Sequence, residues 1–291
     1  MQDFRMETFL TVCETMNFTK AAAILNLTQP AVSQHIHFLE EAYEIKLFSY
    51  QGKRIFLTEA GEILRNFALT LKHDEIHLKN KLISTLVPKK EFIFGATLTV
   101  AEFILPQKIK SFLSRTGGSQ IQMRVRNTHE LLRELDSGEI DFAVIEGYFP
   151  KEEYDYITYS VEPYIAICSP EDYERLQNAS LEDLLNETLI LREDGSGTRE
   201  ILQVFLTGKN LSFSDFKNRM IIENIGAIKK LTADGCGISF LYEKAVEPEL
   251  KAGILKKLDL SEFSLSHEVM FIFRKNSLFK TDYEKFYNYF S

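Results

Sequence analysis

The sequence predicts an α/β protein: a small, mainly helical domain with a β-hairpin wing, a long linker helix, and a larger domain built on a doubly wound sheet. Three observations support this prediction. Apolar residues recur at helical spacing over the first 45 residues, Gly61 is the only glycine or proline in residues 58–86, and short apolar strands alternate with helical stretches from residue 91 onward. A chain of 291 residues has room for two or three compact units.

Composition limits the classes of function. With 45% hydrophobic and 26% charged residues, the chain has an ordinary globular mixture. The net charge of −8, from 34 basic and 42 acidic residues, argues against a protein that coats nucleic acid without sequence preference, although a sequence-specific reader depends on local charge. No apolar run approaches the ~20 residues that cross a bilayer. The first residues lack the pattern of a secretory signal, so we expect a cytoplasmic protein without membrane contact.

The three cysteines, Cys13, Cys168 and Cys236, form no CxxC pair and no cluster with histidine. A disulfide framework and structural zinc are therefore not expected, and no metal or cofactor is predicted. We expect small buried thiols. A redox switch at Cys236, in the segment DGCGIS, is the alternative.

The first 30 residues predict two helices and the start of a third. Apolar residues of the first helix share one face: Met6, Phe9, Leu10, Cys13 and Met16. Thr19 is expected to cap a short second helix that ends near Leu25. Thr28 is expected to cap the third, with Pro30 in its first turn, where a missing N–H costs nothing.

The third helix carries the strongest functional signal. Its inward stripe is Val32, Ile36, Leu39 and Tyr43, and its outward face carries Gln29, Ser33, Gln34 and His37. Glutamine and serine side chains on a helix that follows a tight turn can pair with base edges in the major groove of DNA. The spacing therefore indicates a helix-turn-helix with a reading face.

A hairpin is expected next, with strands at Leu47–Phe48 and Ile55–Leu57. Lys53 and Arg54 at its tip could contact phosphate or the minor groove. The alternative is a small helical domain that binds no DNA and whose polar helix face is only solvated. Residues 1–60 favour that alternative in one respect, because five Lys/Arg against seven Asp/Glu give a net charge of −2.

The segment 59–88 predicts a long helix. Its apolar residues repeat with a period near 3.5: Leu64, Phe67, Leu71, Leu78, Leu82 and Leu86. Such a seam is typical of dimerisation, and a helix packed on its own domain is the alternative. His73 and His77 are spaced i, i+4, but without a third ligand we expect them on a solvated face rather than around a metal.

From residue 91 the strand–helix alternation predicts a mainly parallel sheet. The expected strands are 92–94, 121–125, 142–145, 164–168, 189–191, 220–222, 238–241 and 269–273, with helices at 104–113 and 130–135. Ligands bind such sheets beyond the carboxyl ends of the strands, where the loops 95–99, 127–128 and 193–199 lie. Hydroxyls, free N–H groups and a helix dipole in GSGTR together suit an anion, although an ordinary capped turn is the alternative.

Enzyme signatures are missing from the sequence. It has no HExxH set and no GxSxG elbow, and GSGTR is neither a P-loop nor GxGxxG. We therefore predict that the chain is not an enzyme and has no catalytic residues. Two alternatives remain: a phosphate-handling enzyme built on GSGTR, and a ligand-binding module with a vestigial DNA-binding domain.

Two sets of motifs resemble a known family. The run FTKAAAILNLTQPAVSQHIHFLEEAYEIKLF, followed by LTEAG, is similar nearly residue for residue to the DNA-binding signature of LysR-type transcription regulators. The order GATLT, ILP, SGEIDFAVIEG, SLEDL, GSGTR, ADGCGISFLYEKAV over residues 91–275 resembles the effector domain of the same family and, more distantly, periplasmic-type binding proteins.

For the DNA-binding part, the resemblance implies base contacts from Gln29, Pro30, Ser33 and Gln34, and backbone contacts from Thr19 or Thr28 and from the wing. The sequence departs from the family pattern at Glu44, where glycine is common, and at Tyr50, where arginine is common. The first departure puts the turn before the wing in doubt, and the second leaves more of the phosphate contact to Lys53 and Arg54.

For the domain organisation, the resemblance implies a winged helix-turn-helix at 1–58, a linker helix at 59–88 and an effector domain at 89–291. Lobe I would comprise about 89–161 and 267–291, and lobe II about 162–266, with crossovers near 160–162 and 266–268. The cleft between the lobes would be lined by Thr97, Leu98, Thr99, Thr128, Glu146, Ser196 and Thr198, with 225–227 as further candidates. Glu146 would favour a ligand with an amine or hydroxyl, or would bond the other lobe.

The implied function is a sequence-specific transcription regulator whose DNA binding or activation is modulated by a small polar or anionic metabolite. The implied partners are double-stranded DNA with an interrupted palindrome, further copies of the chain in a homodimer or homotetramer, and RNA polymerase.

Overall fold

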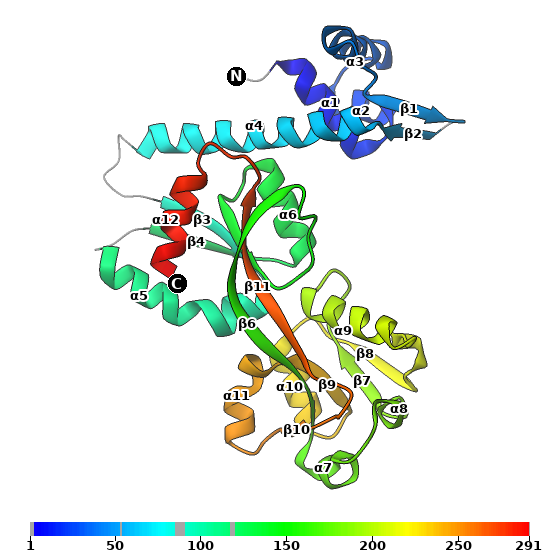
Figure 1. Ribbon diagram of the computed structural model, residues 1–291, viewed down its shortest axis with the longest axis vertical. Helices are drawn as coiled ribbons and strands as arrows, with labels where there is room; N and C mark the ends of the chain where they lie inside the picture. The colour runs from blue at the N-terminus through cyan, green and yellow to red at the C-terminus, as the bar shows by residue number, and fades with distance from the viewer. Residues whose placement is uncertain (1–2, 53, 85–90, 117–119, 291) are drawn as a thin grey trace.

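The computed structural model describes residues 3–52, 54–84, 91–116 and 120–290. Figure 1 shows a small N-terminal domain at one end of the long helix α4 (Glu59–Ser84). Two α/β lobes follow below this helix, and the long strands β6 (Tyr154–Cys168) and β11 (Leu265–Arg274) run through both of them. The predicted fold class is therefore confirmed, with both lobes sharing one sheet.

The N-terminal domain packs three helices against a hairpin. The helices are α1 (Phe4–Thr15), α2 (Phe18–Leu25) and α3 (Gln29–Tyr43), and the hairpin strands are β1 (Phe48–Gln51) and β2 (Arg54–Leu57). Thr28 caps α3 as predicted, because its side chain accepts a hydrogen bond from the Ala31 N–H at 3.3 Å. Asn17 caps α2, so the predicted cap at Thr19 is wrong.

Two expected core positions are exposed. Val32, Ile36 and Leu39 are buried as predicted, but Tyr43 is 53% exposed because α3 ends there, beyond the last side chains that could cover it. Met16 lies outside α1, in the left-handed conformation that ends the helix, and its side chain is exposed. A helical stripe predicts burial only as far as another element packs against it.

Helix α4 begins against the base of the wing. A Cβ at Gly61 would lie 2.2 Å from the Leu47 carbonyl oxygen, so only glycine allows this approach. Leu64 and Ala68 join the core of the N-terminal domain. The predicted seam is thereby divided: Leu64 is buried, whereas Phe67, Leu71, Leu78 and Leu82 are exposed. Leu86 lies outside the described residues.

Lobe I contains the parallel strands β3 (Glu91–Ala96), β4 (Gln120–Val125) and β5 (Phe142–Ile145). It is covered by η1 (Val100–Ile104), α5 (Leu105–Thr116), α6 (Thr128–Ser137) and the C-terminal α12 (Lys280–Phe290). Short apolar strands separated by helices give this part its βα order, as the sequence predicts.

Lobe II contains β7 (Thr188–Leu191), β8 (Asn218–Ile221), β9 (Ile238–Tyr242) and β10 (Lys256–Leu258). Its helices are α7 (Pro170–Leu176), α8 (Leu181–Leu184), α9 (Gly197–Gly208), η2 (Phe213–Asp215), α10 (Ile225–Ala233) and α11 (Glu243–Lys251). The strand order of the whole sheet is β4-β3-β5-β11-β6-β9-β7-β8, with β10 on β6. Because β6 and β11 run antiparallel to their neighbours, the sheet is mixed rather than mainly parallel.

Polar contacts hold α4 on lobe I. His73 Nε2 lies 3.2 Å from the Ile140 carbonyl oxygen, and His77 Nδ1 lies 2.7 Å from Asp141. Both histidines therefore contact lobe I, and the expectation of a solvated face is wrong. Arg274, which is 0% exposed, pairs with Asp136 at 2.8 Å and donates to the α4 carbonyl of Asn66 at 3.1 Å.

The three cysteines differ in their exposure to solvent. Cys168 is buried as expected and Cys13 is half-buried, but Cys236 is exposed, so the expectation of a buried thiol is wrong there. Within the described ranges, no helix combines the length and apolar character that a membrane span requires.

Candidate functional site

The N-terminal end of α3 presents a polar face. Gln29, Pro30, Gln34 and His37 are exposed and Ser33 is half-buried. Gln29 Nε2 donates to Ser33 Oγ at 2.8 Å, and His37 Nε2 lies 3.1 Å from the Glu41 carboxylate. The structure therefore brings five of the predicted DNA-contacting residues onto one exposed helix face, of the width that a major groove accepts.

The remaining predicted DNA contacts lie around this face. Thr28, at the N-terminus of α3, and Thr19, in the first turn of α2, are both exposed. Arg54 begins β2 and is exposed, and Lys53 lies outside the described residues. A groove of ≈ 400 Å³ between α3 and β1 is lined by Ser33, His37 and Tyr50, among others. Tyr50, 66% exposed, lines this groove from β1.

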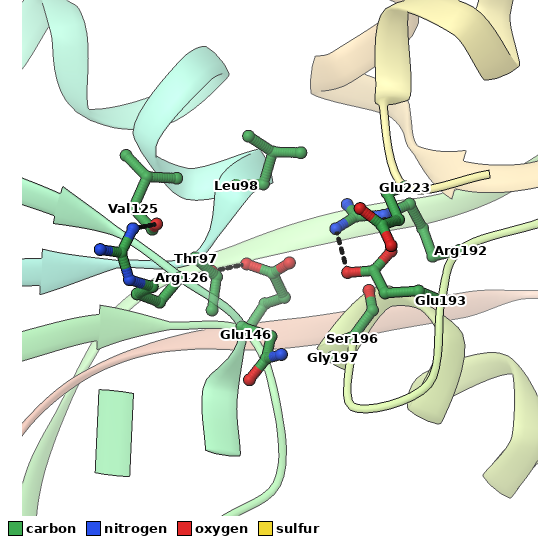
Figure 2. A pocket seen from close by; sticks show the side chains of 11 residues that line it. Thr97, Leu98, Val125, Arg126, Glu146, Arg192, Glu193, Ser196, Gly197 and Glu223 are labelled. Carbon is green, nitrogen blue, oxygen red and sulfur yellow. Dashed lines mark hydrogen bonds and ion pairs between the residues drawn. The ribbon is translucent and has the colours of Figure 1, made fainter. Parts of the chain in front are cut away.

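A second candidate site lies between the two lobes. A cavity of ≈ 180 Å³ opens between the end of β3 and the start of α9 (Figure 2). Its lining is polar and comes from both lobes: Thr97, Leu98, Val125, Arg126, Asn127, Glu146, Arg192, Glu193, Ser196, Gly197 and Glu223. Of the predicted residues, the structure places Thr97, Leu98, Glu146 and Ser196 on this lining.

Glu146, just after β5, is the central group of the cleft. The Thr97 hydroxyl donates to Oε2, and the Thr198 hydroxyl, from lobe II, donates to Oε1 at 3.2 Å. Thr99 Oγ1 lies 3.3 Å from Thr198 Oγ1. These predicted residues therefore form one buried network that joins the lobes. Burial raises the pKa of the Glu146 carboxyl above its ordinary value, and the hydrogen bonds from Thr97, Thr99 and Thr198 and the charge of Arg192 oppose this rise only in part.

Close packing of glycines keeps the lobes in contact beside this network. A Cβ at Gly197 would lie 2.8 Å from the Cα and the N of Gly147, so the two segments approach as backbones. Thr128 lies behind Gly147 and is buried; its Oγ1 would be 2.2 Å from a Cβ there. Thr128 does not line the cavity, and neither do residues 225–227, where Ile225 is part of the lobe II core.

Three polar residues of the cavity lie outside the loops that the sequence predicts for it: Arg126, Arg192 and Glu223. Arg192, 6% exposed, makes a two-point pair with Glu193, at 2.7 Å through Nε and 2.8 Å through Nη2. Arg126 lies 3.6 Å from Glu134 and donates to the Val125 carbonyl. A charged residue directly after a predicted strand is the available signal for Arg192 and Arg126, because strand ends meet at the cleft.

Arg199, in GSGTR, lies beside the cavity rather than on its lining. Its guanidinium donates to the Arg192 carbonyl at 3.4 Å, approaches Asp194 at 3.7 Å and stacks over Phe213. Arg199 therefore makes structural contacts with neighbouring residues of lobe II. Across the described ranges, histidine, cysteine and acidic side chains gather nowhere in a group of three or more that could hold a metal ion.

Comparison with family models covers nearly the full chain. The model described as "Bacterial regulatory helix-turn-helix protein, lysR family" matches residues 4–62, and the "LysR substrate binding domain" matches residues 87–290.

Among curated relatives, the chain is 30% identical over 287 residues to the HTH-type transcriptional activator CmpR of Synechocystis sp., covering 98% of this chain and 93% of that protein. It is 28% identical to the HTH-type transcriptional regulator CysL of Bacillus subtilis, over 92% of this chain and 89% of that one. Both relatives are named as transcription regulators rather than enzymes.

Two solved structures share the fold. Full-length LysG from Corynebacterium glutamicum, solved with bound effector Arg, superposes with a TM-score of 0.63 at 18% identity, covering 100% of this chain and 98% of that chain. A full-length OxyR variant from Pseudomonas aeruginosa gives a TM-score of 0.59 at 19% identity, with both chains covered completely.

Proposed function

Because this chain belongs to the LysR family of DNA-binding transcription regulators with an effector-binding domain, we propose that the exposed face of α3 reads its DNA site and that the cavity around Glu146 binds its effector. The observation that carries this proposal is the pairing of the two sites in one chain: a reading helix with Gln29, Ser33 and Gln34 outward, and a polar cleft whose walls come from two lobes.

Base reading is assigned to Gln29, Ser33 and Gln34 of α3, with His37 one turn further along. Amide and hydroxyl groups can make paired hydrogen bonds with base edges, whereas Thr19, Thr28, Lys53 and Arg54 suit phosphate contact. Two such N-terminal domains, one from each chain of a dimer, would act as DNA-binding heads and bind an interrupted palindrome. The exposed residues of α4, Phe67, Leu71, Leu78 and Leu82, form a face suited to a second copy of the chain.

The effector step follows from the contacts between the lobes. The Thr198 hydroxyl of lobe II donates a hydrogen bond to Glu146 of lobe I. A ligand in the cleft that contacts Glu146 or Ser196 therefore changes the equilibrium between closed and open arrangements of the lobes. Only a ligand with different affinity for the two states can shift that equilibrium. The contacts of His73, His77 and Arg274 connect lobe I to α4 and so to the DNA heads.

Further parts of the proposal rest on family membership. The chain works without enzymatic turnover in the cytoplasm, as a homodimer or homotetramer, and contacts RNA polymerase when it activates. Hydrolysis or transfer of a bound ligand by the purified protein would contradict the first of these.

The test is fluorescence anisotropy with the chain's own upstream DNA and a scrambled duplex, across a salt series. A preference of ~10³-fold or more for the upstream DNA is expected. Ser33→Ala combined with Gln34→Ala should reduce that preference, whereas Arg54→Ala should weaken both duplexes alike. Equal losses on both duplexes from both variants would refute the division into base and phosphate contacts.

A further inference from the structure

We propose that the effector carries a protonated amine and that Glu146 is the residue that selects it. This inference rests on the proposed assignment of the cleft as the effector site. It concerns one chemical class, small ammonium-bearing molecules, and it assigns to Glu146 a direct contact with the ligand.

Among the described residues, no arginine or lysine is hydrogen-bonded or ion-paired to Glu146. The charge of Arg192 acts on Glu146, but its guanidinium is hydrogen-bonded to both carboxylate oxygens of Glu193. Arg126, the other arginine of the wall, donates to the Val125 carbonyl and lies 3.6 Å from Glu134. Figure 2 shows the Arg192–Glu193 pair on the lobe II side of the cavity, with Glu146 on the other side next to Thr97. The groups that donate to Glu146 are hydroxyls, which carry no charge, so the site lacks a cation in direct contact with this carboxylate.

Glu146 also has hydrogen-bonding capacity left for a ligand. A carboxylate can accept about four hydrogen bonds. Thr97 donates to Oε2 and Thr198 to Oε1, and with the hydrogen bond from Thr99 about one of the four positions remains for a ligand donor. An ammonium group supplies several donors and a charge at once, and its hydrogen bonds to a carboxylate are about twice as strong as neutral ones.

Burial makes the contact selective. Glu146 is 2% exposed, so solvent screens a ligand charge there far less than at the surface. Burial raises the pKa of Glu146, and a bound ammonium group favours its ionised form, whereas an anionic ligand group placed there would meet like charge or require the carboxyl to stay protonated. The wall carries three acidic side chains, Glu146, Glu193 and Glu223, against two arginines, Arg126 and Arg192, and this balance favours a cation over an anion. The cavity of ≈ 180 Å³ is below the ~300 Å³ of pockets for drug-sized molecules, which indicates a small amine.

The experiment compares molecules that differ in the amine alone. Thermal unfolding of the full chain at neutral pH is measured with ethanolamine against ethylene glycol, and with L-alanine against L-lactate. The amine of a pair should raise the Tm, and titration should give an affinity about tenfold or more above that of its hydroxyl analogue, as a charged hydrogen bond implies. Equal shifts, or no shift, within both pairs would overturn the inference, and so would stronger stabilisation by lactate than by alanine.

Two variants locate the amine contact. Glu146→Gln keeps the size of the side chain and removes its charge, and it should abolish the amine preference. Asp194→Asn removes an exposed acidic group that is near the cleft but not on its lining, and it should retain the preference. The Tm of each variant without ligand shows that it folds. A preference that survives in the Glu146 variant, or is lost only in the Asp194 variant, would refute the role of Glu146.

The anisotropy assay separates this inference from the proposed function. If the protein prefers its upstream DNA while small anions, and not amines, stabilise it, the regulator function stands and the amine inference fails. If the amine preference is present but no specific DNA is bound, the ligand class stands and the regulator function fails.

Discussion

Glu44 holds a backbone conformation that favours glycine. It ends α3 with φ 53° and ψ 31°, in the left-handed region, and the next N–H, of Ile45, bonds back to the Glu40 carbonyl at 3.1 Å. A side chain with a Cβ costs roughly 1 kcal/mol there. The turn before the wing therefore forms in the usual way without the glycine that resembling sequences carry.

Glu44→Gly should stabilise the N-terminal domain by about 0.5–1 kcal/mol, because glycine adopts the left-handed region without strain. Thermal unfolding of the full chain, followed by a probe in the N-terminal domain, measures the change. The matched control is Ala42→Gly, two residues earlier inside α3, which should cost ~1 kcal/mol. Destabilisation by both variants would show that the end of α3 is not strained.

Glu146 makes stability depend on pH in a stated direction. Burial raises its pKa in the folded protein above the ordinary value of 4.5. The folded state therefore holds the proton more tightly than the unfolded state, so this group favours folding at low pH, and that contribution is lost as pH rises through the folded pKa. The Glu146→Gln variant has no carboxyl at this position, so it does not lose this contribution to folding stability as the pH rises.

Thermal melts of the unliganded protein between pH 5 and 8 measure this effect. The Tm of Glu146→Gln, relative to the unchanged chain, should rise as the pH increases above the ordinary carboxyl pKa and should level off once the folded carboxyl is ionised. Both proteins share every other titrating group, including the neighbouring His267. A Tm difference that stays constant or falls with rising pH would mean that the folded carboxyl is not destabilised by burial.

At the scale of elements, the joint between α4 and lobe I is polar and buried. Arg274 is its centre: it pairs with Asp136 at 2.8 Å and lies 3.8 Å from Glu153, which in turn accepts from Arg65 of α4 at 2.6 Å. Asp74 of α4 accepts from the Ser277 hydroxyl at 2.6 Å, and its pKa is lowered because burial is outweighed by bonds from His73, Ser277 and the Leu278 N–H. Polar contacts of this kind fix the orientation of the helix.

Arg274→Met should cost about 3–5 kcal/mol of unfolding free energy, because it leaves the Asp136 carboxylate with an incomplete set of partners in a half-buried site. Urea unfolding measures the loss, and hydrogen exchange of α4 should become faster. Lys280→Met is the control: its pair with Asp155, at 3.1 Å, is half-exposed and should be worth at most ~1 kcal/mol. Unchanged protection of α4 in Arg274→Met would show that the joint does not depend on this residue.

At the scale of the whole molecule, the protein reads DNA with few cations. Of the basic residues in the described ranges 3–52 and 54–60, Arg5 pairs with Asp3 and Lys46 with Glu40. That leaves Lys20 and Arg54 in those ranges, and Lys53 precedes Arg54 in the sequence. The net charge of −8 opposes rather than assists approach to DNA.

The salt dependence of DNA binding should therefore be shallow. Three cations per head and two heads predict a slope of log affinity against log salt of about −5. Anisotropy titrations at four or more salt concentrations measure it. Lys20→Ala should make the slope shallower by about 2, and Glu59→Gln, at the start of α4, should leave it unchanged. A slope near −10 would require phosphate contacts from residues not assigned here.

Local patterns in the sequence determined much of this protein. The cap at Thr28, the buried stripe Val32, Ile36 and Leu39, the hairpin and the strand–helix alternation all depend on residues within a few positions of one another. The loops that supply Thr97 and Ser196 are predicted because strand ends in such sheets meet at one edge. Glu146 is predicted only from the family resemblance, whereas the other features follow from backbone chemistry and periodicity alone.

The tertiary structure decided which of those groups act together. His73 and His77 are buried or half-buried because segments 67 and 64 residues away cover them, and Thr198 reaches Glu146 across 52 residues. The exposure of Tyr43, the division of the α4 seam and the pairing of Arg192 with Glu193 on the cavity wall likewise depend on what packs opposite. The physical reason is that burial and charge pairing belong to surfaces in contact, and here those contacts are created by β6 and β11, which carry the chain into lobe II and back.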